Sequence, residues 1–113
     1  MKTDRELLEL AARSIGLLGS FSEYHQGITY SKPGSLDMHV WSPLTDDGDA
    51  LRLAVACNLT VCTDGSATVS ACQEFDRANV FATQSVGECG GCKFTATRRA
   101  ITRAAAAIGE SMK

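Results

Sequence analysis

Apolar residues recur at helical spacing in three segments of the chain, and each segment contains a helix start signal. In the first segment, Thr3 and Glu6 fit a capping box, in which each side chain satisfies a backbone donor of the first turn. Gly16 suits the position just after the last turn, where the left-handed backbone conformation ends many helices. Four apolar residues lie at positions i, i+3, i+4 and i+7 and form the face expected to be buried: Leu8, Ala11, Ala12 and Ile15.

The second helical segment lies within Trp41–Ala56. Thr45 is a suitable N-cap, and the acidic residues that follow place negative charge at the positive end of the helix dipole. Apolar residues occupy almost every side of this segment, so the pattern predicts a largely buried helix. They are Ala50, Leu51, Leu53, Ala54, Val55 and Cys57.

The third helical segment, Thr95–Glu110, is rich in alanine. We expect the helix to begin near Thr95 or Thr97, after the glycine-containing stretch. Small side chains permit close packing against a sheet or another helix. The predicted buried stripe consists of Ile101, Ala104, Ala105, Ile108 and Met112.

The strands predicted between these helices are short. Ile28–Tyr30 and Met38–Trp41 flank the turn signal Pro33-Gly34, which predicts a hairpin. The preceding segment, Ser20–Gly27, fits either an exposed loop or a twisted first strand.

A second set of strands follows the middle helix. Leu59–Cys62 and Ala67–Cys72 flank Thr63-Asp64-Gly65, and a three-residue loop with left-handed Gly65 keeps the apolar residues on one face. That register pairs Leu59 with Val69 and Val61 with Ala67. Val80–Ser85 is the third strand of this set.

The predicted order is therefore α-β-β-α-β-β-β-α. This order predicts an α+β fold in which an antiparallel sheet of about four to five strands is packed between helices. The 113 residues fit a single domain, residues 1–113, and the composition of 44% apolar and 21% charged residues is that of a globular protein.

The net charge of −2 does not favour binding to nucleic acid or to an anionic membrane. Apolar runs are too short to span a bilayer, and the first residues lack the pattern of a signal peptide. We therefore expect a cytoplasmic protein with no membrane partner. The five cysteines are expected to be thiols or metal ligands, because disulfides are rare in a reducing compartment.

Three segments carry a resemblance to a known family: Lys2–Leu8, Trp41–Leu51 and Ala96–Ile101. With these segments the chain resembles the phage α-β-α (ABA) sandwich domain family of small tailed-phage proteins. The resemblance covers most of the chain and implies a sheet between helical layers. It also implies a phage or prophage origin and action in the host cytoplasm.

Cys89-Gly90-Gly91-Cys92 is the sharpest chemical motif. Two thiolates at this spacing suit half of a tetrahedral zinc site, whose other ligands would have to come from elsewhere in the fold. A redox-active pair is a further alternative, although the motif lacks a helix that starts at its first cysteine. The interpretation favoured by the sequence is a flexible glycine turn with free thiols. The side chains available to complete a zinc site are Cys62, Cys72, His25 and His39.

Arg98, Arg99 and Arg103 form a small basic surface on the last helix, with Arg99 and Arg103 on one side of it. Guanidinium groups suit phosphate or carboxylate, so an anion site is one interpretation and a solvated helix face is the other. Trp41 and Tyr24 are the aromatic candidates for contact with a partner. For Trp41, a core position that fixes the entry to the second helix is favoured over an exposed binding position.

No set of residues in the sequence identifies a reaction, so we expect no enzyme. The first functional hypothesis follows from the resemblance: a non-catalytic phage inhibitor that binds a host protein or a complex of a host antiviral defence system. The second is a binder that sequesters a nucleotide-like immune signal through Arg98, Arg99 and Arg103. The third is a small zinc-stabilised module built around Cys89 and Cys92. A homodimer through the alanine-rich last helix is compatible with all three.

Overall fold

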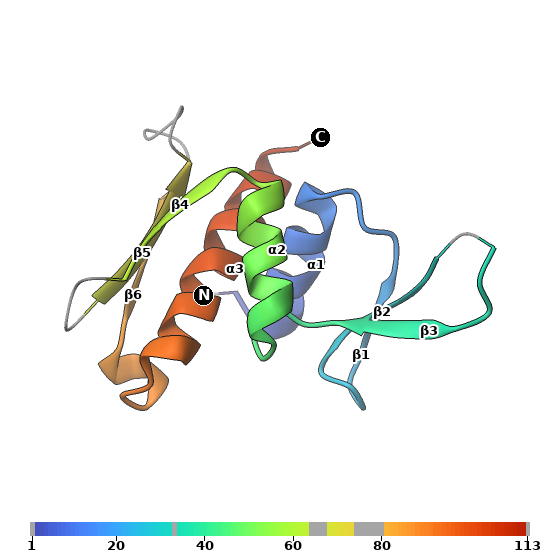
Figure 1. Cartoon of the computed structure of the whole chain (residues 1–113), viewed down its shortest axis with the longest axis horizontal. Helices are drawn as coiled ribbons and strands as arrows, with labels where there is room; N and C mark the ends of the chain where they lie inside the picture. Colours follow the sequence, from blue (N-terminus) through green and yellow to red (C-terminus); the bar gives the residue numbers. More distant parts are fainter. Residues whose placement is uncertain (1, 33, 64–67, 74–80, 113) are drawn as a thin grey trace.

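Three α-helices form the middle of the molecule, and a small antiparallel sheet lies on each side of them (Figure 1). The computed structural model describes residues 2–32, 34–63, 68–73 and 81–112, and all the elements lie within these ranges. The helices are α1 (Asp4–Ser14), α2 (Asp47–Ala56) and α3 (Lys93–Ser111), with a short 3-10 helix, η1 (Gly87–Cys89), before α3. The strands are β1 (Ser20–Ser22), β2 (Gly27–Ser31), β3 (Met38–Trp41), β4 (Leu59–Cys62), β5 (Thr68–Gln73) and β6 (Phe81–Ser85).

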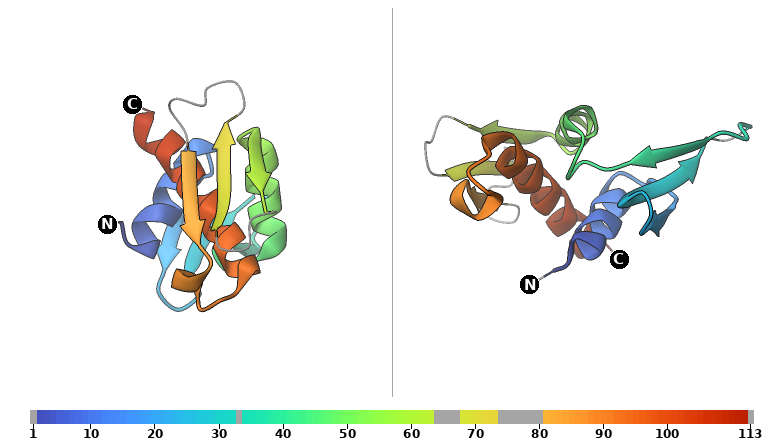
Figure 2. Two further views of the ribbon diagram at one scale, coloured as in Figure 1. Left: turned by 90° about the vertical axis from the view of Figure 1, so that its left-hand side faces the viewer. Right: turned by 90° about the horizontal axis from the view of Figure 1, so that it is seen from below.

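The six strands form two separate sheets, β1-β2-β3 and β4-β5-β6, and every pair of neighbouring strands is antiparallel. α3 covers the β4–β6 sheet, and α1 lies against the β1–β3 sheet on the opposite side (Figure 2). The α+β class is confirmed. The predicted order lacks β1, and the prediction of one sheet between helical layers is wrong, because the helices lie between two sheets.

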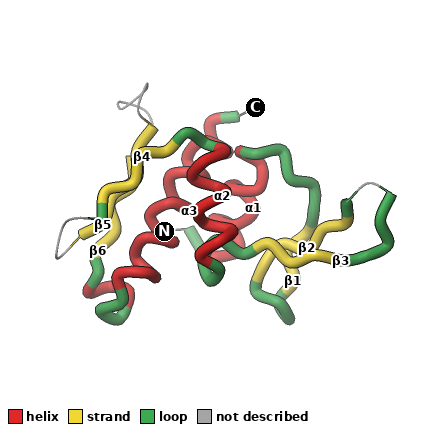
Figure 3. The backbone as a smooth tube through the Cα atoms, in the orientation of Figure 1, coloured by secondary structure: helices red, strands yellow, loops and turns green. Residues whose placement is uncertain are grey.

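The separation into two sheets has a local cause. Each sheet is a meander whose strands pair with their neighbours in the sequence, so neither needs a strand from the other. Asn58, with a φ of 55°, lies at the end of α2 and turns the chain into β4 on the other side of the helices. The backbone tube shows the two groups of strands at opposite ends of the helical layer (Figure 3).

The register of β4 and β5 differs from the predicted one. Val61 lies opposite Ala71 and Leu59 opposite Gln73, so the predicted pairing is wrong by four residues. Because four is an even number, the apolar residues still share one face. The register follows packing, since Val69 and Ala71 are buried on the helix side of the sheet. The predicted turn residues Asp64 and Gly65 lie outside the described residues, as does Ala67.

Local signals position α1 as predicted. The Thr3 hydroxyl accepts the Glu6 N–H at 3.2 Å, and the Glu6 carboxylate accepts the Thr3 N–H, which completes the capping box. Gly16 has a φ of 70° just beyond the C-cap, as predicted. Four residues of the helix are buried, three of them from the predicted stripe: Leu7, Leu8, Ala11 and Ala12.

The N-cap of α2 is Asp46, one residue after the predicted cap Thr45. The Asp46 side chain accepts the Asp49 N–H at 2.8 Å. The prediction that α2 is largely buried is wrong for one face. Leu51 and Val55, one helical turn apart, are 65% and 69% exposed. Within the described part of the chain, no element covers this face of the helix.

α3 begins at Lys93, earlier than predicted, and is buried on two sides because it lies between α1 and the β4–β6 sheet. Ile101, Ala104 and Ala105 are buried as expected, whereas Met112 is 42% exposed and does not belong to the buried stripe. Gly109 packs directly on the backbone of α1, where a Cβ atom would lie 1.9 Å from the Leu10 carbonyl oxygen.

The core has two parts. The larger part joins the three helices to the β1–β3 sheet, and the smaller part consists of alanines between α3 and the β4–β6 sheet. Trp41 belongs to the larger part with 7% exposure, which confirms its core interpretation and removes it as a surface contact. Among the described residues, none of the helices combines the length and the hydropathy that a membrane-spanning segment requires.

Candidate functional site

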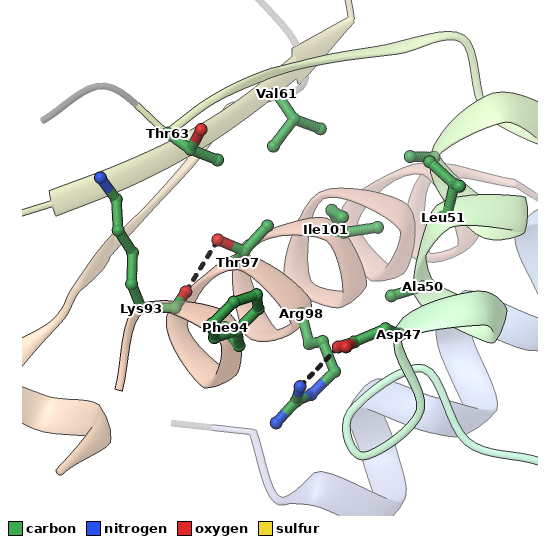
Figure 4. A pocket seen from close by; sticks show the side chains of 11 residues that line it. Asp47, Ala50, Leu51, Val61, Thr63, Lys93, Phe94, Thr97, Arg98 and Ile101 are labelled. Atoms are coloured by element: carbon green, nitrogen blue, oxygen red, sulfur yellow. Dashed lines mark hydrogen bonds and ion pairs between the residues drawn. The ribbon is translucent and has the colours of Figure 1, made fainter. Parts of the chain in front are cut away.

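A groove of about 500 Å³ lies between α2, α3 and the end of β4 (Figure 4). α3 supplies the floor, α2 one wall and β4 the other. Most of the lining side chains are apolar, and the polar ones gather at the end near the start of α3. The lining consists of Asp47, Ala50, Leu51, Ala54, Val61, Thr63, Lys93, Phe94, Thr97, Arg98 and Ile101.

The groove exposes large apolar side chains that the fold itself does not cover. Ala50 in the α2 wall and Ile101 in the floor are buried, but Phe94 is 70% exposed and Leu51 is 65% exposed at the rim. Val55 continues this apolar surface along α2 by one helical turn. A groove that presents such residues together is typical of a binding surface, because single exposed apolar residues are common and clustered ones are not.

Two cations stand at the groove, and they differ in their partners. Arg98 is held in place, since it donates to the Leu44 carbonyl oxygen at 3.0 Å, to Asp47 at 2.6 Å and to the Thr95 hydroxyl at 3.1 Å. The Lys93 ammonium has no hydrogen bond or ion pair with any described residue, and its side chain points toward Thr63 (Figure 4). Of the two basic residues among the described lining residues, Lys93 is therefore the one without an internal partner in the described part of the chain.

The arrangement offers binding contacts. Among the described lining residues there is no serine, cysteine or histidine to act as a nucleophile or as a neutral base. Thr97 is occupied, because its hydroxyl donates to the Lys93 carbonyl oxygen at 2.8 Å. The groove therefore suits an apolar group with an anionic group beside it.

The three arginines predicted to form one basic surface do not lie together. Arg98 faces α2, whereas Arg99 and Arg103 line a second cavity of about 410 Å³ on the other side of α3. Successive helical residues are rotated by about 100°, so residues 98 and 99 diverge. Arg99 binds Asp4 at 3.0 Å, and Arg103 donates to the carbonyl oxygen of Thr83 and to the side chain of Gln84.

The internal contacts of Arg99 and Arg103 argue against the predicted anion site at these two residues. Two acidic side chains, Glu88 and Glu110, line the second cavity beside the arginines, and Glu110 binds Lys2 at 2.8 Å. The Arg99 and Arg103 guanidinium groups already have acceptors within the protein. An incoming phosphate would have to replace these acceptors, so the geometry favours a structural role for both arginines.

Tyr24, the remaining aromatic candidate, is almost fully exposed between β1 and β2 and packs edge-on against the His25 ring, with 4.9 Å between the ring centroids. It belongs to the β1–β3 side of the molecule, whereas the groove lies on the β4 side (Figure 1). The structure therefore does not bring Tyr24 to the groove.

Cys89 and Cys92 lie in a turn that leads directly into α3, with Cys92 as the N-cap residue. Cys92 is exposed and Cys89 is half-buried. Within the described ranges, no three His, Cys, Asp or Glu side chains come close enough together to hold a metal ion. The additional ligands that a zinc site requires, proposed as Cys62, Cys72 and the histidines, are thus not assembled around this turn.

Of the groove residues, Lys93 was considered in the sequence only as a contributor to an anion site at the start of the last helix, Leu51 was expected to be buried, and Phe94 was not singled out. A signal for the exposure of Leu51 existed, because the second helix has more apolar residues than one buried face needs. Comparison with known protein families, with curated proteins and with solved structures found no match. The resemblance to the phage sandwich family therefore stays a prediction.

Proposed function

We propose that this chain is a non-catalytic binding protein that holds an apolar segment of a protein partner in the groove between α2, α3 and β4. The observation that carries the proposal is the exposure of Leu51 and Phe94 on either side of an apolar floor. The partner segment brings apolar side chains to the floor and a carboxylate to Lys93.

The apolar part of the groove supplies most of the affinity. Full burial of a leucine or phenylalanine side chain contributes about 1.5–3 kcal/mol relative to exposure. Leu51 and Phe94 are already partly covered, so we expect each to contribute about 1–2 kcal/mol when a partner covers the remainder. Val55 extends the contact for a partner that is longer than the groove.

The charged end of the groove supplies selectivity. An exposed ion pair contributes only about 0–1 kcal/mol, so a carboxylate at Lys93 adds little affinity. It discriminates by sign, because the Arg98–Asp47 pair is neutral overall and Lys93 leaves a net positive charge at this end of the groove, which repels a partner that brings a cation. Asp47 does not reverse this preference, since its carboxylate is paired with Arg98.

β4 adds a backbone surface next to the groove. This strand is at the edge of its sheet, and within the described residues no backbone segment pairs with its outer side. Val61 of this strand and Thr63 just beyond it line the groove, so the free edge of β4 borders the groove. An extended partner segment can therefore use the free N–H and C=O groups of β4 together with the apolar floor.

The biological part of the proposal rests on the sequence resemblance alone. If the chain is a phage or prophage protein, the partner is a host protein, and its capture would inhibit an assembly of host antiviral defence. The geometry of the groove specifies the chemistry of the partner segment and not its source.

The first test uses 8-anilinonaphthalene-1-sulfonate, which joins an apolar ring system to an anionic sulfonate as the groove requires. We expect saturable fluorescence enhancement that weakens at least fivefold in Leu51→Asp and in Lys93→Glu. Leu36→Asp is the matched control, because Leu36 is fully exposed between β2 and β3 on the other side of the helices. Equal affinity in wild type and both groove variants would overturn the assignment of the groove.

The second test identifies the partner class. A host protein supports the proposal when tagged wild type and Leu36→Asp retain it and Leu51→Asp does not. Retention by all three chains contradicts binding in the groove. Native mass spectrometry that finds a small apolar acid in wild type, lost in Leu51→Asp, and no protein would replace the protein partner by a small ligand.

A further inference from the structure

Cys89 and Cys92 are held in a turn that allows them to approach each other. The Cys92 N–H donates to the Cys89 carbonyl oxygen at 3.3 Å, which closes a four-residue turn. Gly90 and Gly91 have φ values of 70° and 78°, a left-handed pair that other residues rarely adopt. Such a turn keeps its outer Cα atoms within about 7 Å, and disulfides join Cα atoms about 4.4–6.8 Å apart.

The second cysteine has the environment of a reactive thiol. Cys92 is exposed and is the N-cap of α3, a helix of 19 residues, so its sulfur stands at the positive end of a long helix dipole. The pKa of Cys92 is lowered, chiefly by the hydrogen bond that the Thr95 hydroxyl gives the thiolate and then by the Thr95 N–H. The Cys92 side chain makes no capping hydrogen bond in the structure, so the two Thr95 donors remain for the thiolate.

Thr95 is oriented for this role by the groove arginine. Arg98 donates to the Thr95 hydroxyl oxygen at 3.1 Å, which leaves the hydroxyl proton for the Cys92 sulfur. The positive charge of Arg98 also lowers the pKa of Cys92, as the weakest of these causes. Arg98 itself is fixed by Asp47 and the Leu44 carbonyl oxygen, so the donor to Cys92 is held in place.

We propose that Cys89 and Cys92 form a redox-active dithiol that a small-molecule disulfide oxidises to an intrachain disulfide. The Cys92 thiolate attacks one sulfur of the small disulfide, forms a mixed disulfide and releases one small thiolate. Cys89 then loses its proton to solvent and attacks the Cys92 sulfur, which forms the Cys89–Cys92 bond and releases the second small thiolate. Two protein thiols are oxidised, and one disulfide is reduced to two thiols.

The other cysteines lack this combination of features. Cys57 is buried, and burial raises the pKa of its thiol. Cys62 and Cys72 lie on the outer face of the β4–β6 sheet, but Cys62 pairs with Ser70 and Cys72 with Thr60. The two are therefore diagonal neighbours about 7–8 Å apart, beyond the usual reach of a disulfide.

The test treats the reduced full chain with oxidised glutathione and follows intact and peptide masses over time. We expect the peptide that contains both cysteines to lose two hydrogen atoms, with only transient glutathione attachment. Cys89→Ser should accumulate glutathione on residue 92, because no second thiol resolves the mixed disulfide. Cys92→Ser should slow the first step at least tenfold, and Cys62→Ser, the matched control, should react as wild type does.

Thr95→Val tests the positioning of the thiolate separately from folding. Loss of the hydroxyl donor should raise the pH midpoint of Cys92 alkylation by iodoacetamide while the circular dichroism spectrum is unchanged. Stable glutathione attachment in the wild type, without conversion to the internal disulfide, would overturn the proposal. Equal rates of the first step in wild type and Cys92→Ser would also overturn it.

Discussion

The closest backbone contact between α1 and α3 gives a stringent test of the fold. Gly109 of α3 faces the α1 backbone, and an added Cβ atom would lie 1.9 Å from the Leu10 carbonyl oxygen and 2.8 Å from its carbon. The nearest acceptable carbon–oxygen contact is about 3.3 Å. Gly109→Ala therefore requires the helices to move apart by about 1 Å or more, since neither atom belongs to a flexible side chain.

The magnitude follows from two opposing effects. Alanine in place of glycine in a helix gains about 1 kcal/mol of intrinsic propensity. Overpacking of a close contact costs about 1–3 kcal/mol of stability. Because the clash at Gly109 involves backbone atoms, we expect its cost to be about 3 kcal/mol or more. The separation also loosens Leu8, Ala11 and Ala12, which are buried at the same interface. We expect a net loss of about 2 kcal/mol, or roughly 8 °C in Tm for a domain of this size.

The assay is thermal unfolding followed by circular dichroism, with urea unfolding as a second measurement. Gly48→Ala in α2 is the control, because a Cβ atom there meets only the flexible end of Arg52 and the Asp46 carboxylate, at 3.2–3.3 Å. We expect that variant to remain within about 0.5 kcal/mol of wild type. A Gly109→Ala chain as stable as wild type, or more stable, would refute the α1–α3 packing described above.

Three further predictions concern the groove and the turn before α3. Arg98→Met should lower the free energy of unfolding by about 1–3 kcal/mol in urea titration, because the Leu44 carbonyl oxygen and Asp47 lose a charged partner; an unchanged midpoint would contradict this. Leu51→Asp should leave stability within about 0.5 kcal/mol of wild type, since its side chain is exposed; a large loss in Tm would mean that Leu51 belongs to the core. The lowered native pKa of Cys92 stabilises the fold above the ordinary thiol pKa of about 8.5, and this stabilisation is lost as pH falls through the native pKa. Wild type should therefore gain Tm relative to Cys92→Ser as pH rises toward the ordinary thiol pKa, and parallel Tm curves would refute the shift.

The helices could be predicted because their signals are local. The Thr3–Glu6 capping box and Gly16 act within a few residues of each other, and the structure contains both. The start of α3 was predicted too late because threonine is a common cap, whereas Cys92 occupies that position. This difference matters chemically, since it places a thiol at the helix dipole.

The groove could not be predicted, because a periodic pattern does not state what covers each face. Leu51 and Leu53 are equally apolar in the sequence, yet Leu53 is buried and Leu51 is not. The difference depends on where α3 and β4 lie relative to α2. The same reasoning applies to the arginines, since the partners of Arg98 and Arg99 lie 51 and 95 residues away in the sequence.

The sequence by itself determined the α+β class, the place of each helix and most strands, and the sharing of one face by Val61 and Ala71. These features depend on interactions within a few residues or on the alternation of side chains along a strand. Only the tertiary structure decided that the strands form two sheets around the helices, that Leu51 is exposed and which residues pair with the arginines. Those features depend on contacts between segments far apart in the chain, whose free energy belongs to the packed arrangement and to neither segment alone.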